Sequence, residues 1–298
     1  PGLNVVIREI VMSLHFNYEV PEIWGIMWGY KGIYTDTHKN WLRLTPQNCK
    51  NIHKFGGTIL GSSRGGFDAD KILDSLKMRG INMIFIIGGD GTHRGIEELM
   101  KSSKKRKMPI SFIGVPKTID NDIPIIDHSF GFWTACGVAE RMINSAYTEA
   151  TSVVNGVGLV KLMGRYSGYI AMTACLASNN VDICLIPEMS FELGGPEGLY
   201  EQVVRSVRTK GHCVVVVAEG AEEGLVNPGE AITKNPKKDD SGNLIFDDIG
   251  TFLKQHIVEH AKSQHGLSLN LKYIDPSYMI RSVPANATDT ILCAKLAQ

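Results

Sequence analysis

The sequence predicts an α/β protein with mostly parallel sheets, on three observations. Residues 84–87 are a continuous apolar run (Ile-Phe-Ile-Ile), which is typical of a strand buried on both faces. Residues 92–104 follow with helical spacing, and residues 110–114 form another apolar run. The same alternation restarts after residue 130. Strands that alternate with helices favour a parallel sheet covered on both faces.

The other elements follow from the same periodicities. Residues 4–17 have helical spacing with Asn4 as the expected N-cap, and a helix that begins there requires a preceding strand. The remaining elements expected in the first half are strands at 24–28 and 58–60, a glycine-rich loop at 61–66, and a helix to about residue 78 capped by Asp68 or Asp70. Those expected in the second half are helices from after Asp127 to about 150 and at 167–177, 196–209 and 249–264, strands at 156–162, 182–186, 213–218 and 271–274, a polar surface excursion at 221–248, and a helix after Pro284.

This pattern predicts two Rossmann-like lobes, each a three-layer αβα unit, with a cleft between them. We expect one lobe to hold residues 1–130 plus about 282–298, and the other to hold residues 131–281. In open α/β sheets, ligands gather at the carboxyl ends of the strands. We therefore expect the site in the cleft.

Composition excludes several classes of function. The chain has 298 residues, of which 43% are hydrophobic and 21% charged, as in an ordinary globular protein. Lys+Arg and Asp+Glu both number 31, so no overall field attracts nucleic acid or a membrane, and the basic run at 101–107 is interpreted as a solvated helix end. No apolar stretch approaches a membrane span, and no signal peptide is visible. Six widely spaced cysteines without a CxxC pair indicate reduced residues of an intracellular protein.

A phosphate-binding turn is the first candidate site. Residues 88–92 read Gly-Gly-Asp-Gly-Thr between a strand and a helix. Glycines let the backbone approach a ligand, helix N–H groups point at anionic oxygens, and Asp90 can reach a phosphate-bound Mg²⁺. The alternative is an ordinary turn in which Asp90 caps the helix.

Further acids and cations also follow predicted strands. Residues 116–122 carry Lys117, Asp120 and Asp122, so a carboxylate there can accept a proton from a substrate hydroxyl while the lysine balances phosphate charge. The alternative is a loop that caps itself through its Asx residues. Later strand ends carry Met163-Gly164-Arg165, Glu219-Gly220 and Tyr278-Met279-Ile280-Arg281.

Together these motifs resemble those of the phosphofructokinase family. The matching segments, in the family's order and spacing, are GGTILGSSRGG at 56–66, GGDGT at 88–92, PKTIDND at 116–122, MGR at 163–165, Glu219 and YMIR at 278–281. They span nearly the whole chain. The combination of Gly91, Lys117 and YMIR is most similar to the plant and protist branch, which uses ATP although it groups by sequence with pyrophosphate-dependent enzymes.

The resemblance implies ATP-dependent phosphorylation of D-fructose 6-phosphate to fructose 1,6-bisphosphate by an allosteric enzyme of glycolysis. Asp120 would be the general base, Arg165 and Lys117 would complete the catalytic group, and Asp90 would hold Mg²⁺. The nucleotide would face Arg64, Gly89, Asp90, Gly91 and Thr92 in the lobe of residues 1–130. The sugar phosphate would contact Thr118, Ile119, Asp120, Met163, Gly164, Arg165, Glu219, Tyr278 and Arg281, mostly in the other lobe. The resemblance also implies a homo-oligomer, a dimer or tetramer, in the cytoplasm or in a plastid or other organelle.

Four departures from the family pattern qualify this expectation. Tyr278 stands where bacterial members have a histidine, Lys272 where they have an arginine, and Gly156 where a neighbouring subunit's arginine would enter. The chain also begins after the family's first strand and Gly-Gly turn and stops before the usual end, so we expect it to be incomplete and inactive by itself. Pyrophosphate users carry Asp at the position of Gly91, which favours ATP here, although they share Lys117.

Other functions are compatible with parts of this pattern. One is a pyrophosphate-dependent enzyme with the same acceptor, and another is a non-catalytic or truncated subunit that binds ligand without turnover. NAD kinases and lipid kinases share GGDGT but lack PKTIDND and MGR. Residues 256–260 fit the HxxEH pattern of inverted zinc proteases, but their apolar spacing favours an ordinary amphipathic helix.

Overall fold

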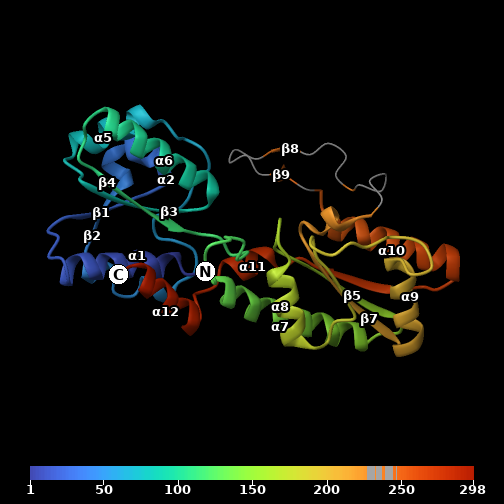
Figure 1. Ribbon diagram of the computed structural model, residues 1–298. Coiled ribbons are helices and arrows are strands. Elements are labelled where there is room, and N and C mark those ends of the chain that lie inside the picture. The colour runs from blue at the N-terminus through green and yellow to red at the C-terminus, as the bar shows by residue number, and fades with distance from the viewer. Residues whose placement is uncertain (227–231, 233–236, 239–243, 246) are drawn as a thin grey trace.

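The computed structural model describes residues 1–226, 232, 237–238, 244–245 and 247–298. It has two lobes that lie side by side (Figure 1). The α/β class with mostly parallel sheets is confirmed. In the described ranges, no helix combines the length and the apolar character needed to cross a membrane.

The first lobe contains two separate pairs of strands. Its elements are α1 (Leu3–Phe16), β1 (Ile23–Ile26), α2 (Gly29–Tyr34), α3 (Thr37–Asn40), β2 (Trp41–Leu44), α4 (Pro46–Cys49), η1 (Ile52–Lys54), α5 (Ala69–Met78), β3 (Met83–Gly88), α6 (Asp90–Lys105) and β4 (Ser111–Pro116). β1 and β2 pair antiparallel, whereas β3 and β4 pair parallel. The two pairs are not hydrogen-bonded to each other.

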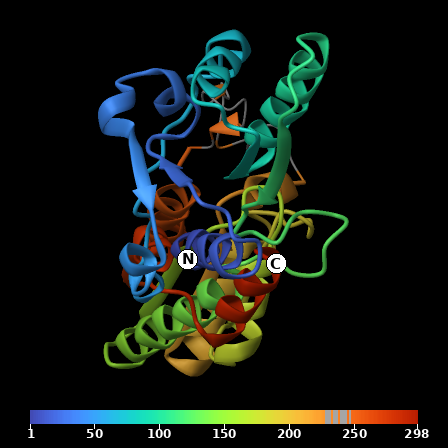
Figure 2. The same cartoon turned by 90° about the vertical axis from the view of Figure 1, so that its left-hand side faces the viewer.

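Helices cover the first lobe on both sides of β3 and β4. On one side, residues of α1 and Cys293 of the C-terminal helix α12 (Ala287–Leu296) pack against Val115 of β4. On the other, Ile72 and Leu76 of α5 pack with Leu99 of α6 and the β3 side chains. In Figure 2 this lobe faces the viewer and lies in front of the other one.

Several local predictions for the first lobe need correction. Residues 58–60 form a turn rather than a strand, and β2 is an unexpected strand that pairs with β1. Asn4 does not cap α1, because the helix begins at Leu3 and the buried Asn4 side chain instead accepts a hydrogen bond from the N–H of Ile59 at 2.8 Å. Asp68 does cap α5, as expected, by accepting from the N–H of Lys71 at 3.1 Å.

The second lobe is built on one continuous parallel sheet, in the order β10-β5-β7-β6. Its elements are α7 (Phe132–Thr151), β5 (Gly156–Leu162), α8 (Tyr169–Ser178), β6 (Ile183–Leu185), α9 (Leu199–Lys210), β7 (His212–Ala218), η2 (Ala221–Gly224), β8 (Lys237–Lys238), β9 (Leu244–Ile245), α10 (Ile249–His265), β10 (Asn270–Ile274) and α11 (Ser277–Arg281). α7 and α8 lie on one face of the sheet, and α9 and α10 lie on the other (Figure 1). The expected excursion at 221–248 lies partly outside the described residues.

After α11 the chain returns to the first lobe. α12 lies against α1, so the last helix of the chain packs beside the first (Figure 1). The buried carboxylate of Asp289 in α12 accepts hydrogen bonds from the N–H and the hydroxyl of Thr134, at 2.7 and 2.5 Å. These bonds tie the start of α7 to α12 and so help to fix one lobe against the other.

Candidate active site

A cleft of about 1880 Å³ lies between the lobes. Its walls include the turn at 88–92, the loop at 116–122, and strand ends of the second lobe. A volume of this size is large enough for two small molecules side by side. All of the predicted site residues line the cleft except Gly164.

The turn at 88–92 has the geometry of an anion site. Gly88 is buried, and a Cβ there would lie 2.4 Å from the Thr92 hydroxyl oxygen, so only glycine fits. The first bond of α6 runs from the N–H of His93 to Gly89 O at 3.0 Å. The N–H groups of Asp90, Gly91 and Thr92 therefore have no acceptor within the helix and can face an anion.

Asp90 does not cap α6. The N-cap residue is Gly89, which makes no side-chain capping bond, and Asp90 is the first helical residue. Its side chain is exposed to the cleft and forms no hydrogen bond or ion pair with the described residues. A cleft carboxylate without a protein partner is a suitable Mg²⁺ ligand, because Mg²⁺ is usually held by one or two carboxylates plus substrate phosphates.

The loop at 116–122 lies directly beside this turn. The N–H of Lys117 donates to Gly88 O at 2.9 Å, which continues the β3–β4 pairing. The Thr118 hydroxyl donates to Asp122 at 2.8 Å and accepts from the N–H of Asp120 at 3.2 Å. The loop thus caps itself in part, as the alternative interpretation expected, but the Asp120 carboxylate is not used for this.

Asp120 is the most perturbed acid of the cleft. One oxygen of its carboxylate is buried and has no hydrogen-bond partner among the described residues. Burial, followed by the negative charges of Asp122 and Glu219, raises the pKa of Asp120 to about 6, against the opposing effect of Arg165. A carboxylate with a pKa near neutrality can exchange a proton with a substrate hydroxyl.

Lys117 supplies a cation next to this acid. Its side chain keeps access to the cleft, but the surrounding walls remove part of its solvent. This desolvation lowers the pKa of Lys117, while the charge of Asp120 acts in the opposite direction. The lysine can therefore interact with an anion at low desolvation cost.

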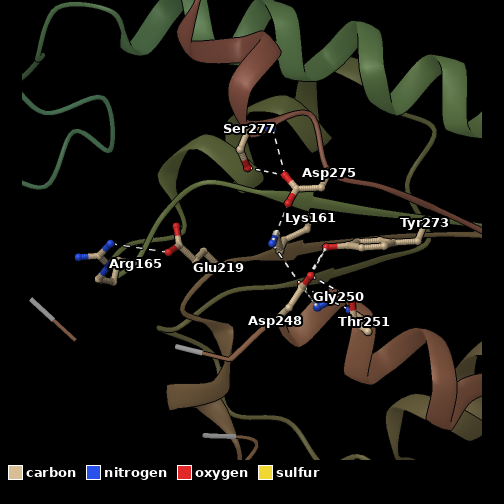
Figure 3. A network of polar contacts seen from close by, with 9 residues as sticks. All are labelled: Lys161, Arg165, Glu219, Asp248, Gly250, Thr251, Tyr273, Asp275 and Ser277. Atoms are coloured by element: carbon tan, nitrogen blue, oxygen red, sulfur yellow. Dashed lines mark hydrogen bonds and ion pairs between the residues drawn. The ribbon is translucent and has the colours of Figure 1, made fainter. Parts of the chain in front are cut away.

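The second lobe contributes an ion pair to the opposite wall. Arg165 and Glu219, each just beyond a strand end, lie 3.7 Å apart (Figure 3). The Nε of Arg165 is buried and unpartnered within the described ranges, so the guanidinium retains donor capacity. Met163 lines the cleft, whereas Gly164 lies behind it with φ +124° and a position where a Cβ would approach Ser167 O to 2.2 Å. Gly164 therefore shapes the backbone that presents Arg165.

A network centred on Lys161, which lines the cleft together with Asp275, was not predicted. The Nζ of Lys161 lies 2.8 Å from Asp275 and 3.2 Å from Asp248, and Tyr273 donates to Asp248 at 2.9 Å (Figure 3). Burial alone would lower the pKa of Lys161, but the hydrogen bond to Asp275 and the neighbouring acids raise it overall. The sequence signal that could have revealed this network is Lys161, which lies within the otherwise apolar strand β5.

The expected phosphate-binding residues lie on α11 and on a first-lobe loop. Tyr278 is 80% exposed, and the Arg281 guanidinium lies over its ring at 4.9 Å from the centroid. Arg64 reaches the cleft from the loop before α5. Lys272, in contrast, is exposed on β10 outside the cleft lining. At Gly156 a Cβ would lie 2.0 Å from Ala150 O, so no side chain can enter there.

Comparison with known proteins shows which family the chain is similar to. The family model described as Phosphofructokinase matches residues 1–298. ATP-dependent 6-phosphofructokinase 7 of Arabidopsis thaliana is 52% identical over 298 residues, which are 100% of this chain and 60% of that protein. The ATP-dependent 6-phosphofructokinase of Borreliella burgdorferi is 45% identical over 302 residues, covering 99% of this chain and 66% of that protein.

Solved structures agree at the level of the fold. A pyrophosphate-dependent phosphofructokinase from Marinobacter aquaeolei superposes with a TM-score of 0.75 at 21% identity, over 99% of this chain and 70% of that one. Phosphofructokinase from Pichia pastoris gives a TM-score of 0.72 at 20% identity, over 100% of this chain and 30% of that one. The chain spans 60% and 62% of the length of the first two curated relatives. From the full-length family match and the glycine turn, acidic loop and Arg165 strand end that meet in the cleft, we conclude that this chain belongs to the phosphofructokinase family.

Proposed function

We propose that the protein transfers the γ-phosphoryl group of ATP to the 1-hydroxyl of D-fructose 6-phosphate, yielding fructose 1,6-bisphosphate as in glycolysis. The observation that carries this proposal is the carboxylate of Asp120, with a pKa raised to about 6 and one buried oxygen without a partner in the described chain. It lies in a loop bonded to a turn suited to phosphate binding.

Asp120 acts as the general base. At neutral pH, a carboxyl group with a pKa of about 6 is mostly ionised, yet it is basic enough to accept a proton as the hydroxyl attacks. The nearby turn and loop align donor and acceptor. Phosphoryl transfer depends chiefly on such positioning and on stabilisation of charge.

The cations stabilise the negative charge of the phosphoryl group that is transferred. Lys117 approaches from the acidic loop, and Arg165 approaches from the second lobe with its buried Nε available. The N–H groups at the start of α6 and the Arg64 side chain bind the nucleotide phosphates. Asp90 holds Mg²⁺, which when bound neutralises charge on those phosphates.

The acceptor sugar contacts mostly the second lobe. Glu219 accepts hydrogen bonds from sugar hydroxyls, and Thr118, Ile119 and Met163 line its surroundings, with Gly164 supporting the backbone. Tyr278 and Arg281 bind the 6-phosphate. The α11 helix presents both residues at the cleft edge, where a phosphate retains part of its hydration.

The donor assignment distinguishes ATP from pyrophosphate. Gly91 is exposed at the cleft and adds neither a side chain nor a charge there, which supports a nucleotide with an α-phosphate. Product formation by the full-length protein should be measured with each donor in turn. We expect turnover with ATP and little with pyrophosphate; the reverse result would overturn the donor assignment. Binding of both substrates without turnover would overturn catalysis.

Assembly and compartment belong to the same proposal. We infer a homo-oligomer, a dimer or tetramer, which native mass spectrometry of the full-length protein tests directly. We also infer a cytoplasmic or plastid location. Two relatives, both from Arabidopsis thaliana, are named as chloroplastic, so fractionation must separate these two compartments.

A further inference from the structure

Three metal-ligating side chains meet on the outer face of the second lobe. Glu201 lies in the first turn of α9, and His260 and His265 lie near the end of α10. The Nε2 atoms of both histidines are 2.8 Å from the same oxygen, Oε1 of Glu201. The three ligand atoms all lie within 4.8 Å of one another. None of these residues is among those that line the cleft.

The convergence matches a transition-metal site. Zn–N and Zn–O bonds of about 2.0–2.2 Å in a tetrahedral site place neighbouring ligand atoms roughly 3.3–3.5 Å apart. The two nitrogen-to-oxygen distances are 2.8 Å, so each would lengthen by roughly half an ångström on metal binding.

The backbone around the three residues is held in place. α10 ends directly after His265 at Gly266, whose N–H donates to Lys262 O at 3.1 Å, and the N–H of Leu267 donates to Ala261 O at 3.0 Å. At the start of α9, the N–H of Tyr200 donates to Leu193 O at 3.0 Å. Only side-chain rotations are therefore needed to complete the site. The side chains are 20%, 18% and 27% exposed for His260, His265 and Glu201, so a water molecule can reach the remaining position.

This cluster differs from the HxxEH pattern at 256–260, for which the sequence favours an ordinary amphipathic helix. Residues 256–260 matched HxxEH, but His256 stacks on Phe252 with ring centroids 4.0 Å apart, and its Nδ1 lies 2.9 Å from Phe252 O. His256 is thereby engaged with its own helix. The cluster instead joins His260 to a histidine five residues later and to a glutamate 59 residues earlier.

We propose that Glu201, His260 and His265 form a binding site for a divalent transition-metal ion of the Zn²⁺ type, with water as the fourth ligand. Two imidazoles and one carboxylate suit Zn²⁺ and its neighbours in the first transition series, whereas Mg²⁺ prefers oxygen ligands. The ion ties the start of α9 to the end of α10. Its effect is on the stability of the second lobe, because the site lies outside the cleft.

The test is metal binding by the purified, metal-stripped protein, with ZnCl₂ as the probe. We expect one high-affinity Zn²⁺ per chain by titration against a chromogenic chelator. At a Zn²⁺ concentration 100-fold above Kd, we expect a rise in Tm on the order of 5 °C. The variants Glu201→Gln, His260→Gln and His265→Gln should each lose at least about tenfold in affinity.

His256→Gln is the matched control, because it removes a histidine from the same helix without touching the cluster, and it should bind Zn²⁺ as the wild type does. Circular dichroism identifies any of the three cluster variants that fails to fold. The Zn²⁺ affinities of the remaining cluster variants then test the proposal. Unchanged affinity in the folded cluster variants would overturn the proposal. So would sulfur-to-metal charge-transfer bands with Co²⁺, which would assign the ion to the free cysteines. Absence of Zn²⁺ binding by the wild type would overturn it as well.

Discussion

The two lobes have the same layered architecture but differ in how their sheets are built. In the second lobe, four parallel strands form one sheet, and the buried side chains around it make a single continuous cluster. In the first lobe, two separate strand pairs leave the buried side chains in three clusters. The second lobe is therefore the firmer platform, and the first is the lobe whose parts can shift more independently.

The two walls of the cleft also differ in how far their charged groups are paired in the absence of ligand. On the second-lobe wall, two ion pairs form before any ligand arrives, Arg165 with Glu219 and Lys161 with Asp275. On the first-lobe wall, Asp90 and one oxygen of Asp120 have no partner in the described part of the chain. Unpaired groups at a site reduce stability in the absence of ligand but remain available for chemistry.

The largest effect should come from removing the unpaired charge of the first-lobe wall. Asp120→Asn in the full-length protein keeps the shape and removes the base, so kcat should fall by roughly 10² to 10⁴ with ATP binding nearly unchanged. Steady-state kinetics and nucleotide titration measure the two quantities. A loss of less than about threefold in kcat would remove Asp120 from the role of base.

The same variant should be more stable than the wild type above pH 6. The pKa of Asp120 is about 6 in the folded chain against an ordinary 3.8, so between these values the unfolded chain binds fewer protons. Wild-type stability therefore falls as pH rises from about 4 to about 6 and remains lower by roughly 2 to 3 kcal/mol above that range. Thermal unfolding should show a higher Tm for Asp120→Asn at pH 8 and equal values near pH 4. A lower Tm for Asp120→Asn than for the wild type at pH 8 would contradict the predicted direction of the effect.

Asp122→Asn is the matched control for charge. Its amide oxygen can still accept from the Thr118 hydroxyl, but the negative charge that helps to raise the pKa of Asp120 is gone. The acidic limb of kcat/KM should shift to lower pH, while the kcat plateau stays within about threefold. An unshifted limb would mean that Asp122 has no electrostatic effect on the base.

Core truncations test the difference between the sheets. Leu159 in β5 and Leu76 in α5 are both fully buried, and Leu→Ala at either site should cost about 2 to 5 kcal/mol. In hydrogen exchange by mass spectrometry, Leu76→Ala should deprotect first-lobe peptides and leave second-lobe peptides protected, because its cluster is separate. Leu159→Ala should deprotect the second lobe throughout. Deprotection of both lobes by Leu76→Ala would contradict the distinction.

The sequence predicted the second lobe better than the first, for a physical reason. Buried parallel strands such as β5 and β7 are long apolar runs that can be recognised locally. β1 and β2 have four residues each and partly exposed positions, so their pattern is weak, and the short pattern at 58–60 predicts a strand where the chain forms a turn. Asn4 looked like a cap because its sequence neighbours are apolar, but its hydrogen-bond partner Ile59 is distant in the chain.

The candidate site also has parts that the sequence predicts and parts that it does not. The turn at 88–92 and the loop at 116–122 are contiguous segments, so sequence alone identified each of them, and the structure shows that they lie side by side. The ion pairs of Lys161, which hold the segment before α11, were not predicted. Lys161, Asp248 and Asp275 come from three distant segments that only the folded sheet brings together. Long-range ion pairs have no local pattern.

The smallest expected effect concerns the ion pair between Lys161 and Asp275. Lys161 binds Asp275, whose carboxylate also accepts from the hydroxyl of Ser277 at the start of α11, so it positions the helix that carries Tyr278 and Arg281. Lys161→Met should raise the KM for fructose 6-phosphate about fivefold, or about 1 kcal/mol, with the KM for ATP and kcat nearly unchanged.

Lys161→Arg should restore most of the affinity, since it returns the charge, and Lys210→Met provides a control in which an ion pair with Asp182 is lost away from the cleft. Equal losses in kcat and affinity would indicate that Lys161 acts on the reacting groups rather than through α11. An unchanged KM in Lys161→Met would show that the paired second-lobe wall is rigid without this lysine, and that the continuous sheet alone sets the position of the helix.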